Sequence, residues 1–79
     1  MTSPGLTLAK LPIGSRAVVA SISGTDDISM RLFEMGLLPG TEFTLLGCAP
    51  LGDPLEIELR GYRLSLRKSE AARVEVTPA

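Results

Sequence analysis

The pattern of apolar and polar positions changes from helical to alternating near the middle of the chain. Ile28, Leu32 and Met35 recur at spacings of four and three, which places them on one stripe of a helix. Asp26 and Asp27 come just before this stripe, so an oxygen-bearing side chain is available to accept from the free amides of a first helical turn. The pattern predicts a short helix with this stripe facing the core.

A glycine and a proline-glycine pair then end the predicted helix. Gly36 lacks a Cβ and can adopt the left-handed conformation that releases a chain from a helix. Pro39 and Gly40 supply the fixed and permissive φ angles of a type II turn. Because β-forming residues follow from Thr41 to Cys48, we expect the helix to be converted into a strand here.

The predicted helix has a second apolar side. Met30 and Phe33, with Leu37 just beyond the glycine, project roughly opposite to the core stripe. One interpretation is that the N-terminal segment or the rim of a barrel covers them. The other is that they form a docking surface.

Alternation is clearest in the second half of the chain. The residues from Leu55 to Leu59 and from Tyr62 to Leu66 alternate between apolar and polar side chains. A hairpin with Arg60 and Gly61 as its two-residue loop places every apolar residue on one face, and it opposes Glu58 to Arg63 on the other face. We therefore assign Gly61 to a structural turn.

The remaining segments complete a mainly β pattern. We expect a tail over residues 1 to 5, strands from Arg16 to Ser23 and from Arg73 to Val76, and a helical turn from Lys68 to Ala72. About five short strands and one short helix predict a small SH3-like barrel, with an OB-like barrel as the alternative. At 79 residues, we assign residues 6 to 79 to a single domain.

Composition restricts the chemistry. The chain has no histidine or tryptophan and only one cysteine, so the usual general base and nucleophile pairs cannot be built. Asp26, Asp27 and Asp53 offer oxygen ligands without clustered spacing. We expect no enzyme activity, no catalytic or metal-ligating residue and no cofactor. Cys48 lies in an apolar strand and is interpreted as a small core or near-core residue, with a reactive role as the minority interpretation.

Charge and hydropathy restrict the partners. Residues 1 to 59 carry three basic and seven acidic side chains, whereas residues 60 to 79 carry five basic and two acidic ones. Part of the basic set is expected to pair locally, as with Glu58 and Arg63. Without excess positive charge and interleaved aromatic residues we expect no nucleic-acid binding, which leaves an acidic protein surface or an anionic membrane leaflet as targets. No apolar run reaches membrane-spanning length and no export signal precedes the domain, so we expect a cytoplasmic protein.

The segment from Ala49 to Pro54 joins two predicted strands. It contains two prolines, a glycine and an acid, which turn chemistry alone explains. A rigid loop that exposes Leu51 and Asp53 at a barrel rim is also a place for partner contact. One tyrosine and two phenylalanines do not support the aromatic groove that binds proline-rich ligands.

Four segments together resemble the ferrous iron transport protein A (FeoA) family. They are Arg31 to Gly40, Ala49 to Pro54, Leu64 to Glu70 and Val74 to Val76, in this order and spacing. The resemblance implies a small cytoplasmic SH3-like protein that is not an enzyme. It also implies work with FeoB, the membrane-embedded, GTP-hydrolysing ferrous iron transporter of bacteria. The chain would then reach the inner membrane only through this partner.

If this family role holds, the exposed helix side, the turn and the loop would together contact the cytoplasmic part of FeoB. The expected contact residues are Met30, Phe33, Leu37, Leu38, Pro39, Leu51 and Asp53. A rival function is a standalone regulatory module, because the C-terminal domains of iron-dependent repressors share this fold. A third is a small metallochaperone for iron(II), which the lack of histidine disfavours. Free strand edges would also permit weak self-association.

Overall fold

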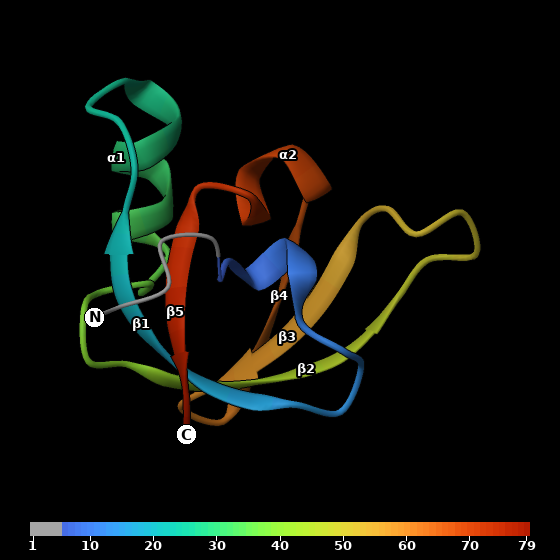
Figure 1. The fold of residues 1–79 in the computed structure, drawn as a ribbon. Helices are drawn as coiled ribbons and strands as arrows, with labels where there is room; N and C mark the ends of the chain where they lie inside the picture. Colours follow the sequence, from blue (N-terminus) through green and yellow to red (C-terminus); the bar gives the residue numbers. More distant parts are fainter. Residues whose placement is uncertain (1–5) are drawn as a thin grey trace.

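Five antiparallel strands form one sheet in the computed structural model, which describes residues 6 to 79 (Figure 1). The strand order is β4-β3-β2-β1-β5. The tail expected over residues 1 to 5 lies outside the described residues, and the assignment of residues 6 to 79 to one domain stays a prediction. The strands are β1 (Arg16–Ile22), β2 (Glu42–Cys48), β3 (Leu55–Leu59), β4 (Tyr62–Leu66) and β5 (Val74–Pro78).

Three short helical segments connect and flank the strands. A 3-10 turn, η1 (Leu8–Lys10), precedes β1, the helix α1 (Asp27–Glu34) connects β1 to β2, and one turn of helix, α2 (Lys68–Ala71), connects β4 to β5. Figure 1 shows β1 and β2 curving beneath the molecule, with α1 on one side and α2 above the sheet. The expected mainly β barrel with one short helix is confirmed.

Two irregularities in the ladders accompany the curvature. The register of β1 against β5 shifts between Val19 and Ser21, and that of β2 against β3 shifts between Leu45 and Gly47. An extra residue in one strand bends that strand and increases its local twist. The sheet can therefore curl until its inner face is enclosed.

The hairpin expected in the second half is confirmed. Leu59 pairs with Tyr62 and Glu58 pairs with Arg63 around the two-residue loop. Arg60 has φ 52° and Gly61 has φ 85°, the two positive angles of a type I′ turn, whose twist matches that of the flanking strands.

The core lies within the curl of the sheet. It is built from the inner faces of the strands together with one residue each from η1, α1 and α2 and one from the turn after α1. On α1 itself Leu32 is fully buried, and Ile28 and Met35 pack against the core while partly buried, as the helical stripe predicted. The buried apolar side chains are Leu8, Ala17, Val19, Leu32, Leu37, Phe43, Leu45, Leu55, Ile57, Leu59, Leu66, Ala71, Val74 and Val76.

The prediction that Leu37 lies on an exposed side of the helix is wrong, because Leu37 is 0% exposed and belongs to this core. The amide of Gly36 donates to the carbonyl of Phe33 at 3.0 Å, and the amide of Leu37 donates to the carbonyl of Leu32 at 3.1 Å. These two bonds define a Schellman motif, in which the residue after the glycine folds back against the last turn of the helix. The helical period therefore no longer governs where Leu37 points.

The prediction that Cys48 is a core or near-core residue is also wrong. Cys48 is exposed, because it is the last residue of β2 and lies at the margin of the sheet. Its partner across the ladder, Leu55, is still buried. The core thus ends between these two side chains.

Candidate protein-docking site

The N-terminus of α1 is fixed by polar contacts to the barrel. The Asp26 carboxylate accepts from the backbone amide of Ser29 at 3.2 Å, and Arg73 donates to the same carboxylate oxygen from Nη1 at 2.5 Å. The buried Ser29 hydroxyl donates to the carbonyl of Ser23 at 2.7 Å. Since Ser23 lies just after β1 and Arg73 just before β5, these contacts attach α1 to the segments beside both strands.

The Asp26 cap is expected to stabilise the fold in a way that depends on pH. The Arg73 side chain first, and the Ser29 amide second, hold the pKa of Asp26 below its usual 3.8. A carboxyl with a lowered folded-state pKa stabilises the fold above its unfolded pKa, and that contribution is lost as the pH falls through the folded value. We expect Asp26→Asn to lower the melting temperature at pH 6, and the difference from the wild type to shrink as the pH falls below 3.8 and through the lowered pKa of the folded state.

Thermal melts by circular dichroism across this range test the prediction. Asp27→Asn is the matched control, because Asp27 carries the same charge one residue further into α1 and is exposed. A difference between Asp26→Asn and the wild type that persisted undiminished at low pH would contradict the assigned role of the carboxylate.

The C-terminal end of α1 is held by two glycines and one tyrosine. Gly36 has φ 107° and Gly40 has φ 90°, angles at which a side chain is strained. The Tyr62 hydroxyl donates to the carbonyl of Met35 at 2.7 Å, which connects the end of the helix to β4. The amide of Thr41 donates to the carbonyl of Leu38 at 3.0 Å and closes the turn around Pro39 and Gly40.

Between these two anchors, α1 and its turn present apolar side chains to solvent. Met30 is 55% exposed and Leu38 is 46% exposed, Pro39 is exposed, and Phe33 is half-buried. Met30 and Phe33 are three residues apart and therefore share a face of the helix. We call Met30, Phe33, Leu38 and Pro39 the helix patch.

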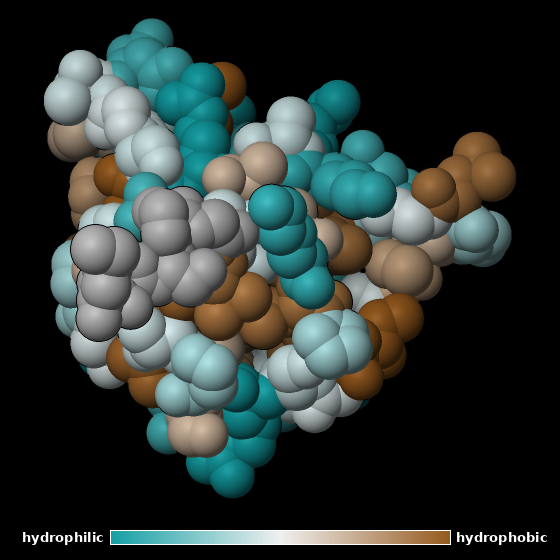
Figure 2. Space-filling model, in the orientation of Figure 1, coloured by the Kyte–Doolittle hydropathy of each residue, from teal (hydrophilic) through white to brown (hydrophobic). Residues whose placement is uncertain are grey.

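The loop between β2 and β3 forms a separate apolar feature. Leu51 is 97% exposed. Figure 2 shows apolar side chains projecting at the right of the molecule, where this loop lies in the same orientation in Figure 1. In Figure 1 this loop, drawn in yellow, and α1 lie at opposite sides of the molecule, so the structure does not bring Leu51 together with the helix patch. The Asp53 carboxylate accepts from the Lys68 amide at 2.9 Å, so it caps α2 within the fold.

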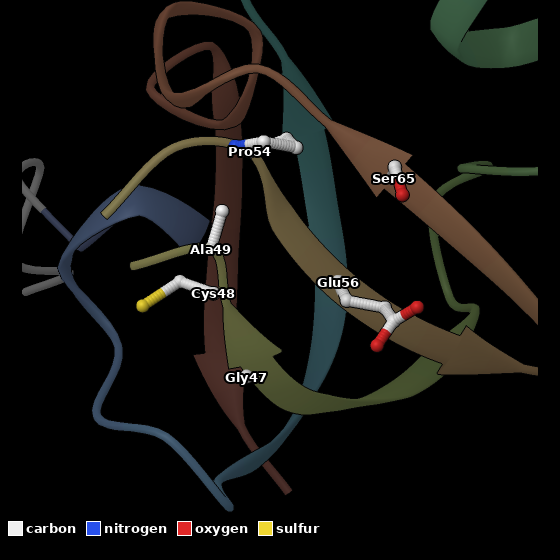
Figure 3. Close-up of a pocket in the computed structure, with 6 residues that line it drawn as sticks. All are labelled: Gly47, Cys48, Ala49, Pro54, Glu56 and Ser65. Atoms are coloured by element: carbon white, nitrogen blue, oxygen red, sulfur yellow. The ribbon is translucent and has the colours of Figure 1, made fainter. Parts of the chain in front are cut away.

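A hollow of about 280 Å³ lies beside the same loop (Figure 3). Its polar groups are the Cys48 thiol, the Glu56 carboxylate and the Ser65 hydroxyl, and Figure 3 shows the thiol and the carboxylate pointing away from each other. Within residues 6 to 79 the structure has no group of three or more histidine, cysteine, aspartate or glutamate side chains arranged to hold a metal ion. None of the helices in this part of the chain combines the length and apolar character needed to cross a membrane.

The fold and its loops define a small SH3-like domain. The FeoA of Stenotrophomonas maltophilia, described as a prokaryotic SH3 domain protein and solved in complex with zinc, superposes with a TM-score of 0.79 at 38% identity. The match covers 91% of this chain and 89% of that one. A FeoA-like protein from Clostridium acetobutylicum superposes with a TM-score of 0.88 at 39% identity over 98% of this chain and 90% of that one. The OB-like alternative is therefore set aside.

A family model for the FeoA domain matches residues 6–78, and the chain belongs to the FeoA family of ferrous iron transport. This confirms the resemblance found in the sequence. A Fe(2+) transport protein A/Fe(2+) transporter FeoB fusion protein of Porphyromonas gingivalis is 37% identical over 71 residues, which is 90% of this chain and 8% of that relative. The IdeR of T. acidophilum has a TM-score of 0.84 over this whole chain and 36% of its own length, at 22% identity, which shows a common fold.

Proposed function

We propose that this chain is an accessory protein of bacterial ferrous iron uptake that acts by direct contact with the cytoplasmic part of FeoB. The observation that carries the proposal is the fusion protein of Porphyromonas gingivalis, in which a homologous domain is joined to a FeoB transporter. A covalent link raises the effective concentration of two modules that bind each other. In this proposal the chain is cytoplasmic, is not an enzyme, needs no cofactor and meets the membrane through its partner.

The helix patch is the surface that we propose for this contact. Its apolar side chains are exposed, while α1 is anchored at both ends by the Asp26 and Tyr62 contacts. A rigid apolar surface loses little conformational freedom on binding, so more of the contact energy appears as affinity. Leu37 is not part of this proposed contact surface because it is buried. Asp53 is left out as well, because its carboxylate accepts from the Lys68 amide and caps α2. Leu51 remains a second, separate candidate.

An amide NMR titration with the purified GTP-binding domain of the cognate FeoB tests the proposal. We expect shifts concentrated on Met30 to Pro39. Met30→Gln combined with Leu38→Gln should weaken binding about tenfold or more, because two apolar contacts are replaced by amides that need solvation. Both side chains are exposed, so the melting temperature should change little.

Ile13→Gln is the matched control, because Ile13 is 61% exposed and lies outside the helix patch. The Ile13→Gln variant should bind the GTP-binding domain of FeoB with the affinity of the wild type. An absence of shifts at high partner concentration would contradict the proposal and favour a standalone regulatory module of the repressor type. Saturable iron(II) binding in an anaerobic titration, without FeoB contact, would instead favour a metallochaperone.

A further inference from the structure

Within residues 6 to 79, the outer edge of β4 is the open edge of the sheet. The sheet ends at β4 on one side and at β5 on the other. The outer side of β5 is joined to the N-terminal segment, since Thr7 bridges to Glu75 and the Val76 amide donates to the carbonyl of Leu6 at 3.1 Å. Among the described residues, β4 pairs with β3 alone.

The hairpin register identifies the backbone groups at this edge. In a two-residue hairpin the residues beside the loop form a hydrogen-bonded pair, and such pairs then recur at every second position. Tyr62, Leu64 and Leu66 thus bond to β3, whereas Arg63 and Ser65 direct their N–H and C=O groups outward. Both residues are exposed, and within residues 6 to 79 neither backbone forms a hydrogen bond outside the hairpin.

The same edge has a concentrated positive charge. From Arg60 to Lys68 the chain has four basic side chains, all on exposed residues, and no acidic one. The three ion pairs of the described chain use Arg16, Arg31 and Arg73 instead. Although Glu58 faces Arg63 in the ladder, the two do not form one of these ion pairs. The four basic residues are Arg60, Arg63, Arg67 and Lys68.

We propose that the β4 edge binds an extended acidic segment of a partner protein by strand addition. An added strand satisfies the outward groups of Arg63 and Ser65, and acidic residues at alternate positions of that strand face the basic side chains. A lipid surface or a nucleic acid offers charge but no ladder of amides and carbonyls. A second copy of this chain, paired antiparallel through β4, places like charges opposite each other. The inference does not depend on which partner the helix patch contacts.

A peptide titration followed by amide NMR tests this inference. The probe is an acetylated and amidated peptide, Thr-Glu-Val-Glu-Val-Glu-Thr, and its control has lysine in place of each glutamate. We expect the acidic peptide to shift the amides of Arg63 and Ser65 and to slow their hydrogen exchange. Its affinity should fall several-fold between about 50 and 300 mM salt, because exposed charges are screened over this range. The lysine peptide should not bind.

Two variants separate the contribution of backbone hydrogen bonds to the peptide affinity from the contribution of charge. Ser65→Pro removes the outward N–H while the ladder to β3 stays intact, since proline is tolerated at an edge where its nitrogen faces solvent. We expect it to weaken binding about tenfold, which is about 1.4 kcal/mol. Arg63→Gln should weaken binding a few-fold. Lys10→Gln, which removes an exposed basic residue outside this segment, should leave binding unchanged.

Five results would overturn the inference. The first three are an absence of shifts at millimolar peptide, equal binding by the lysine peptide, and an unchanged affinity in both Ser65→Pro and Arg63→Gln. The fourth is a shift of the same amides by phosphatidylglycerol vesicles, which would assign the edge to a membrane surface. The fifth is a shift of these amides by dilution alone, which would assign the edge to self-association. If Ser65→Pro does not fold, Arg63→Gln and the lysine peptide still decide the question.

Discussion

Leu37→Ala is expected to lower the free energy of unfolding by about 3 kcal/mol, within the range of about 2 to 5 kcal/mol for truncating a buried leucine. Leu37 is 0% exposed and follows the glycine of the Schellman motif, where the hydrogen bond to Leu32 holds the two residues at the same point of the core. Truncation removes apolar contacts and leaves a cavity that the anchored end of α1 cannot fill by moving. A small domain has a total stability of only about 5 to 15 kcal/mol, so this loss is a large part of it.

Urea denaturation followed by circular dichroism measures this loss. Leu38→Ala is the matched control, since it is the same substitution one residue further along and the side chain is 46% exposed. We expect the control to change the unfolding free energy by less than about 1 kcal/mol. Similar losses in the two variants would show that Leu37 does not belong to the core. The slope of the unfolding transition should stay the same in both.

Gly36→Val is expected to lower the free energy of unfolding by about 2 to 4 kcal/mol, from backbone strain together with a lost hydrogen bond. The φ of 107° is one that side-chain-bearing residues rarely adopt. A Cβ at this position would lie 2.5 Å from the Tyr62 hydroxyl oxygen, so the tyrosine would have to move. Its hydrogen bond to the Met35 carbonyl would then break.

Gly40→Val separates the two contributions to this effect. Gly40 has φ 90°, but a Cβ there would meet no atom within 4 Å, so only the backbone strain applies. The excess loss in Gly36→Val over Gly40→Val measures the clash with Tyr62. Tyr62→Phe should reduce that excess, because it removes the oxygen that the new Cβ would meet. Equal losses in Gly36→Val and Gly40→Val would contradict the assigned contact.

The differences between the expected and the observed site have physical causes. Extending the helical period through Gly36 places Leu37 on an exposed helix side, although a leucine directly after such a glycine is itself the signal of a Schellman motif. The apolar character of its strand places Cys48 near the core, but that character does not reveal where the strand leaves the core. The partner contact expected for Asp53 stays a prediction, and what loop exposure does not reveal is that its carboxylate caps α2, 15 residues away.

Several elements of the fold depend on short-range chemistry alone. The helix from Asp27, its stop at Gly36 and the hairpin around Arg60 and Gly61 follow from periodicity, capping and turn residues that lie next to one another in the chain. The four family segments likewise follow one another in order along the sequence. The mainly β barrel and the FeoA family therefore follow from the order of residues alone.

Which residues are available at the surface depends on how the sheet closes in the tertiary structure. That structure separated the loop of Leu51 from the helix patch and joined the outer side of β5 to the N-terminal segment. Among the described residues it also left the edge of β4 open beside four basic residues. Burial and strand pairing depend on contacts between residues distant in the chain, for example Asp26 with Arg73 and Met35 with Tyr62. The local pattern of residues along the sequence does not predict such contacts, because they form only once the sheet has closed.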